Sequence, residues 1–155
     1  MHRWADQMAK REGNNTKRRI AARGTVLQAE LDRVLGQVRL GQVRYGGSAL
    51  HKKRPGDYGF IPPVNPRPSK SMCDDIRPVL KAEAQSLLTE GIQRGIVSNI
   101  PADGLPKYVW AVDSDQEPYE AKLGEDGQTY HGYRLNKANE SIMRDYVLAE
   151  WRQRA

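Results

Sequence analysis

The chain has few of the residues on which whole classes of proteins depend. Its 155 residues include one cysteine, Cys73, and one phenylalanine, and no run of 18 or more apolar residues occurs. A single cysteine excludes an intrachain disulfide and argues against a cysteine-based metal site. Without a long apolar run we expect no membrane-spanning helix, and residues 1–11 lack the apolar segment of a signal peptide. We therefore expect a cytoplasmic protein that uses no metal or other cofactor.

Positive charge is concentrated in the first third of the chain. Residues 1–54 contain 13 Lys and Arg against 4 Asp and Glu, whereas the remainder contains 12 against 15. A basic segment joined to a mildly acidic body indicates a polyanionic partner, either nucleic acid, above all RNA, or an acidic protein. A solvated arm that only keeps the protein soluble would have the same composition.

Apolar spacing and turn residues predict one folded domain behind a basic arm. We interpret residues 1–47 as a basic, helical N-terminal arm and residues 48–155 as an α+β domain. The best helix of the arm is predicted at residues 25–38, where Thr25 and Gln28 have the spacing of a capping box.

Within the domain, the apolar period changes from helical to alternating. A helix is predicted at residues 78–94. Three alternating segments at 107–112, 117–123 and 129–135 then predict an antiparallel meander, and a closing helix is predicted at 139–152. The expected fold is α+β, an antiparallel sheet of three to four strands with the helices packed on one face.

Nitrogen-bearing side chains are most concentrated just before a predicted turn. The sequence HKKRPGDYGF occupies residues 51–60 and combines cations with an aromatic side chain. Cleavage of RNA to a 2′,3′-cyclic phosphate needs a base for the 2′-hydroxyl, cations for the phosphorane and an acid for the leaving 5′-oxygen. An aromatic ring can stack on an exposed base. Composition alone does not distinguish such a site from a basic surface loop.

The last predicted strand carries a second histidine. Alternation places His131 and Tyr133 on one face of the sheet and Arg134 on the other. Gly132 lets another backbone or a ligand approach the strand closely. His131 and Tyr133 could flank a phosphate and a base, although a single histidine on a strand is more often a half-exposed structural residue.

The two clusters, in this order, resemble the catalytic domain of colicin D. The resemblance rests on LHKKRPGDYG at residues 50–59, a following helix, and a meander that ends in HGYRL at residues 131–135. It covers residues 50–135. It implies a barnase/EndoU/RelE-like α+β fold and cleavage of tRNA anticodon loops.

Carried over by position, the resemblance implies phosphate binding by Lys52 and Lys53 and places Tyr133 where the family has a tryptophan. The family's catalytic histidine falls on Arg54, which cannot act as a base in a protein. The family's active-site serine falls on His131. The imidazole would then come from His131 or from His51, and if it came from neither, the chain would be an inactive relative that only binds RNA.

The sequence thus predicts a metal-independent endoribonuclease of toxin type that acts on structured RNA such as tRNA. An acidic immunity or antitoxin protein is a further expected partner. The expected catalytic residues are His131, His51 and Arg54, and the expected RNA-binding residues are Lys52, Lys53, Arg134, Tyr58 and Tyr133. Two alternatives remain, a non-catalytic nucleic-acid-binding accessory protein of a phage or plasmid, and a protein-interaction module that binds an acidic partner.

Overall fold

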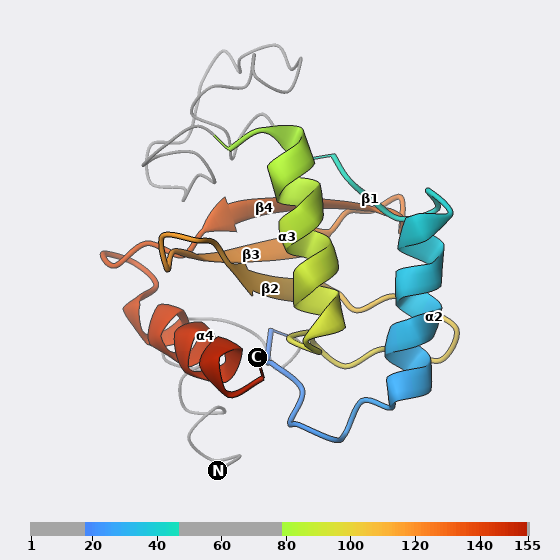
Figure 1. Ribbon diagram of the computed structural model, residues 1–155, viewed down its shortest axis with the longest axis horizontal. Helices are drawn as coiled ribbons and strands as arrows, with labels where there is room; N and C mark the ends of the chain where they lie inside the picture. Colours follow the sequence, from blue (N-terminus) through green and yellow to red (C-terminus); the bar gives the residue numbers. More distant parts are fainter. Residues whose placement is uncertain (1–17, 47–78, 155) are drawn as a thin grey trace.

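The computed structural model describes residues 18–46 and 79–154, and it confirms the predicted α+β class (Figure 1). No helix in these two ranges is long and apolar enough to cross a membrane. The elements in chain order are α2 (Gln28–Arg39), β1 (Arg44–Tyr45), α3 (Lys81–Gln93), β2 (Tyr108–Val112), β3 (Pro118–Leu123), β4 (Thr129–Arg134) and α4 (Ser141–Gln153).

The predicted antiparallel meander is confirmed. β2 pairs with β3 and β3 pairs with β4, both antiparallel. Two aspartates hold the connecting turns. Asp113 accepts hydrogen bonds from the backbone N–H groups two and four residues later, at 2.9 Å each. Asp126 accepts from the N–H groups of Gln128 and Thr129, and these bonds lower the pKa of its carboxyl group.

The sheet as a whole is mixed, and the prediction of a purely antiparallel sheet is wrong in this detail. Its strand order is β1-β4-β3-β2, and β1 runs parallel to β4. β1 consists of only Arg44 and Tyr45, which is too short for alternation to be visible in the sequence.

The helices cover both faces of the sheet, so the prediction of helices on one face is also wrong. Along β2, Val109 packs with α3 and its neighbour Trp110 packs with α4, since successive strand residues point to opposite faces. In Figure 1, α3 runs across the strands, whereas α4 lies apart from it beside β2. The closing helix has one apolar side. That side predicts that the helix packs against the sheet, but it does not predict which face of the sheet the helix covers.

Each face has its own apolar core. The α3-side core consists of Leu31, Val34, Leu35, Val43, Tyr45, Val79, Ala84, Leu88, Ile92, Val97, Val109, Tyr119, Ala121 and Tyr130. The α4-side core consists of Ile20, Ile96, Tyr108, Trp110, Ala111, Val112, Leu135, Met143, Tyr146, Val147 and Trp151.

Close contact between α3 and β2 depends on one glycine of the helix. A Cβ atom on Gly91 would lie 2.4 Å from the carbonyl oxygen of Trp110. Only a residue without a side chain allows this approach. The helix ends before Gly95, which has a φ of 72°, and the N–H of Ile96 donates to the carbonyl of Gly91.

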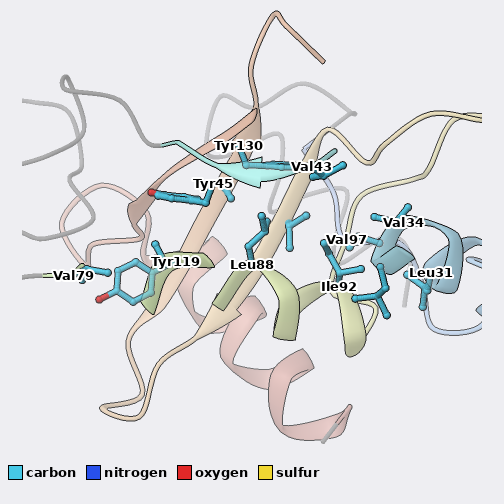
Figure 2. Close-up of a cluster of buried hydrophobic side chains, with 14 residues drawn as sticks. Leu31, Val34, Val43, Tyr45, Val79, Leu88, Ile92, Val97, Tyr119 and Tyr130 are labelled. Carbon is cyan, nitrogen blue, oxygen red and sulfur yellow. The ribbon is translucent and has the colours of Figure 1, made fainter. Parts of the chain in front are cut away.

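The residues assigned to the arm contribute to both cores over the range 18–46. Ile20 is 1 % exposed in the α4-side core, and Val34 is 0 % exposed in the α3-side core. Figure 2 shows Leu31 and Val34 of α2 pointing toward Ile92 and Val97. An arm that is separate from the body therefore does not describe these residues.

The predicted capping box of the first helix does not form. α2 begins at Gln28 with Leu27 as its N-cap residue. The hydroxyl of Thr25 donates to the carbonyl of Ala22 at 2.5 Å and so belongs to the preceding turn.

A substitution at Val34 of α2, and one at Leu40 just after the helix, test whether α2 is part of the core. Val34→Ala should lower the free energy of unfolding by about 1–3 kcal/mol, because it opens a cavity in the α3-side core. Leu40→Ala, at a side chain that is 75 % exposed, should change it by less than about 0.5 kcal/mol. Urea denaturation of both variants measures the difference. Equal, small effects would show that α2 does not contribute to the stability of the sheet.

Candidate functional site

Five of the eight predicted site residues lie outside the residues that the structure describes. They are His51, Lys52, Lys53, Arg54 and Tyr58. The other three, His131, Tyr133 and Arg134, are on β4. His131 and Tyr133 are half-buried and face the α4 side of the sheet, as alternation predicts, whereas Arg134 is buried on the other side.

His131 is flanked across the sheet by a lysine that the sequence analysis did not select. Lys122 of β3 is the register partner of His131, and Tyr108 of β2 is the register partner of Lys122. The ammonium group of Lys122 lies 6.0 Å from the centre of the Tyr108 ring. We call Tyr108, Lys122 and His131 the cationic row. The sequence reveals the pairing of Lys122 with His131 only when the register of β3 and β4 is counted outward from the turn at residues 124–128.

The next row of the same face contains a buried carboxylate. Trp110, Glu120 and Tyr133 are register partners on β2, β3 and β4. Glu120 is 0 % exposed. Its Oε1 atom accepts from the indole N–H of Trp110 at 2.9 Å and from Nε of Arg18 at 2.5 Å, and its Oε2 atom accepts from the Tyr133 hydroxyl. We call Glu120, Trp110, Tyr133 and Arg18 the Glu120 cluster.

Arg18 links this cluster to the start of α4. Its Nη2 atom lies 3.2 Å from Oε2 of Glu140. Burial is the largest single effect and lowers the pKa of Arg18, but the charges and hydrogen bonds of Glu120 and Glu140 together outweigh it, so the pKa is raised overall and the guanidinium stays charged. Burial raises the pKa of Glu120, and the charge and hydrogen bond of Arg18 only partly oppose that rise.

Gly132 separates His131 from Tyr133 and allows a close contact on the other face, as predicted. A Cβ atom there would lie 2.8 Å from the carbonyl oxygen of Glu120 and 3.2 Å from the hydroxyl oxygen of Tyr45. The N–H of Gly132 donates to that hydroxyl oxygen at 2.9 Å. The hydroxyl group of Tyr45 thus gives β4 a hydrogen-bond partner beyond the end of the short strand β1.

Arg134 is not brought together with His131. It lies on the opposite face, 3.8 Å from Glu117, which also pairs with Arg144 of α4 at 2.7 Å. Glu117 therefore partly neutralises the charge that was expected to hold a phosphate.

Two hollows in the described residues bear on whether the fold could hold a small ligand. Beneath α3 lies a mostly apolar cavity of about 30 Å³, which holds no more than a water molecule. No group of three or more metal-ligating side chains comes together in residues 18–46 and 79–154.

An open recess of about 420 Å³ lies between residues 21–28 and the ends of α3 and α4. Its three arginines already bond backbone carbonyls. Arg94 bonds Trp151, Arg154 bonds Gly95 and Arg23 bonds Gln153. These bonds satisfy carbonyls near the helix C-termini, where a positive charge is favoured, so they account for the arginines without a ligand.

Comparison with protein-family models, curated proteins and solved structures gave no match.

Replacing Glu120 by glutamine tests the effect of burial on its carboxyl group. A carboxyl group whose pKa is higher in the folded chain stabilises the fold most when protonated, and this contribution falls as the pH rises above its ordinary value of 4.5. The stability of the unmodified chain relative to Glu120→Gln should therefore decrease as the pH rises. Urea denaturation of both proteins at a series of pH values from about 4 to about 8 measures it. A relative stability that increases with pH would show that Arg18 outweighs burial.

Proposed function

We propose that the chain is a metal-independent endoribonuclease that cleaves structured RNA, such as tRNA, by transesterification. The observation that carries the proposal is the pairing of Lys122 with His131 on adjacent strands, with Tyr133 next to them on the same face. These are three residue types that the reaction needs, and rigid strands hold them side by side.

Each member of this group has a task in the reaction. His131 is proposed to transfer the proton, because an imidazole ring can act as a general acid or a general base. Lys122 places a positive charge beside it for the phosphate, whose negative charge increases in the phosphorane. The half-buried ring of Tyr133 is proposed to stack on a base or pack against a ribose that lies against the sheet.

The remaining charge of the chain supports an RNA substrate. Residues 1–54 have 13 basic against 4 acidic side chains, and most of the affinity of proteins for nucleic acids comes from such charges. Lys52, Lys53 and Arg54, from the run that resembles colicin D, are proposed to bind the phosphates that flank the cleaved bond.

Loss of the imidazole of His131 tests the proposed catalysis. His131→Ala should reduce the rate of tRNA cleavage in EDTA by about 10²–10⁴-fold, the usual contribution of general acid–base catalysis. Its affinity for tRNA should change little, because phosphate contacts dominate binding. Cleavage is read on a denaturing gel and binding by fluorescence anisotropy. Full activity of both His131→Ala and His51→Ala would exclude the mechanism, and tight binding without cleavage by the unmodified chain would favour the nucleic-acid-binding accessory protein.

Removal of lysines tests the binding surface separately. Lys122→Ala, and the double variant Lys52→Ala with Lys53→Ala, should each weaken tRNA binding and flatten its dependence on salt, because fewer counterions are released. Lys81→Ala is the matched control, since Lys81 is exposed at the start of α3 on the other side of the sheet. A control variant that weakens binding as much as Lys122→Ala would show that only net charge matters.

A further inference from the structure

The buried carboxylate of Glu120 is costly to the fold. It occupies the middle position of a row whose other members are Trp110 and Tyr133, on a face that is otherwise covered by the α4-side core. A buried ion pair is often no more stabilising than apolar side chains of the same volume. Buried ionisable groups with shifted pKa values are also concentrated at functional sites.

The contacts of Glu120 distinguish its two oxygens. Two buried donors, from Arg18 and Trp110, hold Oε1 inside the core. Oε2 accepts the hydroxyl of Tyr133, a side chain that is half-buried on the same face as His131. The cluster therefore connects a buried carboxylate to a phenol at the edge of the cationic row.

The spacing of Tyr133 and His131 suits a pair of proton-transfer groups. The two residues are separated by one residue on β4, so their side chains leave the strand about 7 Å apart. That interval accommodates a phosphate whose attacking and leaving oxygens lie on opposite sides.

We propose that Tyr133 is a second catalytic residue of the ribonuclease and that it relays the proton of the RNA 2′-hydroxyl to Glu120. The inference rests on the proposed function. His131, as imidazolium, is the acid of the same step, and Arg18 and Trp110 are positioning residues for the carboxylate.

The step balances without a metal or a redox partner. The 2′-hydroxyl gives its proton to the phenol oxygen of Tyr133 as the phenol proton passes to Oε2 of Glu120. The 2′-oxygen forms a bond to phosphorus, the bond from phosphorus to the 5′-oxygen breaks, and His131 gives a proton to that oxygen. The products are a 2′,3′-cyclic phosphate and a free 5′-hydroxyl, and solvent then restores both protonation states.

The surroundings of Glu120 suit a proton acceptor. Burial raises the pKa of its carboxyl group and so makes the carboxylate a stronger base than an exposed one. The charged and titratable groups around it are Arg18, backed by Glu140, as well as Tyr108 of β2, Lys122 of β3 and Tyr133 of β4. Arg18 and Lys122 limit the rise, so that the carboxylate remains available as a base.

Tyr133→Phe separates the relay from base stacking, because it removes only the hydroxyl and keeps the ring. The relay predicts a loss of about 10²–10⁴-fold in tRNA turnover with unchanged tRNA affinity. Tyr119→Phe is the matched control. It removes a buried hydroxyl that donates to Asp113 at 3.1 Å on the other side of the sheet, and it should cleave at the normal rate.

Glu120→Gln adds a readout that a purely structural role would not move. In the unmodified chain, turnover should fall at low pH as Glu120 is protonated, and this acid limb should be absent from the residual activity of Glu120→Gln. A Tyr133→Phe variant that cleaves at the normal rate while His131→Ala is inactive would overturn the relay and leave the proposed function intact. No cleavage by the unmodified chain would reject the proposed function itself. Because Tyr133→Phe keeps the ring, it decides the question even where Glu120→Gln does not fold.

Discussion

The ion pair between Arg18 and Glu120 ties together parts of the chain that are far apart in sequence. A fully buried carboxylate in the middle strand requires a cation and donors, because an uncompensated charge in a core costs several kcal/mol. Arg18 supplies the cation from the segment before α2, Trp110 a donor from β2, and Tyr133 a donor from β4. Arg18 also pairs with Glu140, so its side chain joins the first described residues to the segment that leads into α4.

The two faces of the sheet differ in their chemistry. On the α3 side, backbone approaches closely at Gly91 and the ring of Tyr45 packs over Gly132, so this face is dominated by tight packing. On the α4 side, the rows of Lys122 with His131 and of Glu120 with Tyr133 place ionisable groups next to one another. Packing on one face holds the strands rigid, and rigidity of the strands is what a catalytic arrangement on the other face requires.

Alternation predicted the meander and the face of His131 and Tyr133, because period 2 is a local property of the sequence. It could not predict the role of Arg18, since a basic residue in a basic stretch carries no sign that its side chain is buried. β1 was missed for a related reason, as two residues show no period. The colicin D-like resemblance predicts site residues at 51–58, which lie outside the described ranges, whereas the place of Lys122 beside His131 follows only from the register of β3 and β4.

The parallel pairing of β1 with β4 also has a consequence for the order of events during synthesis. Arg44 and Tyr45 pair with Thr129 and Tyr130, so an early segment waits for a strand that is translated much later. Contacts this distant in sequence slow folding, and domains complete them only after the later segment has left the ribosome. The strands that carry Lys122 and His131 pair with their neighbours in the sequence, so β1 is the strand that has to wait for a distant partner. Until β4 has left the ribosome, Arg44 and Tyr45 of a nascent chain have no strand to pair with, and the edge of the sheet that they cover in the folded chain does not yet exist.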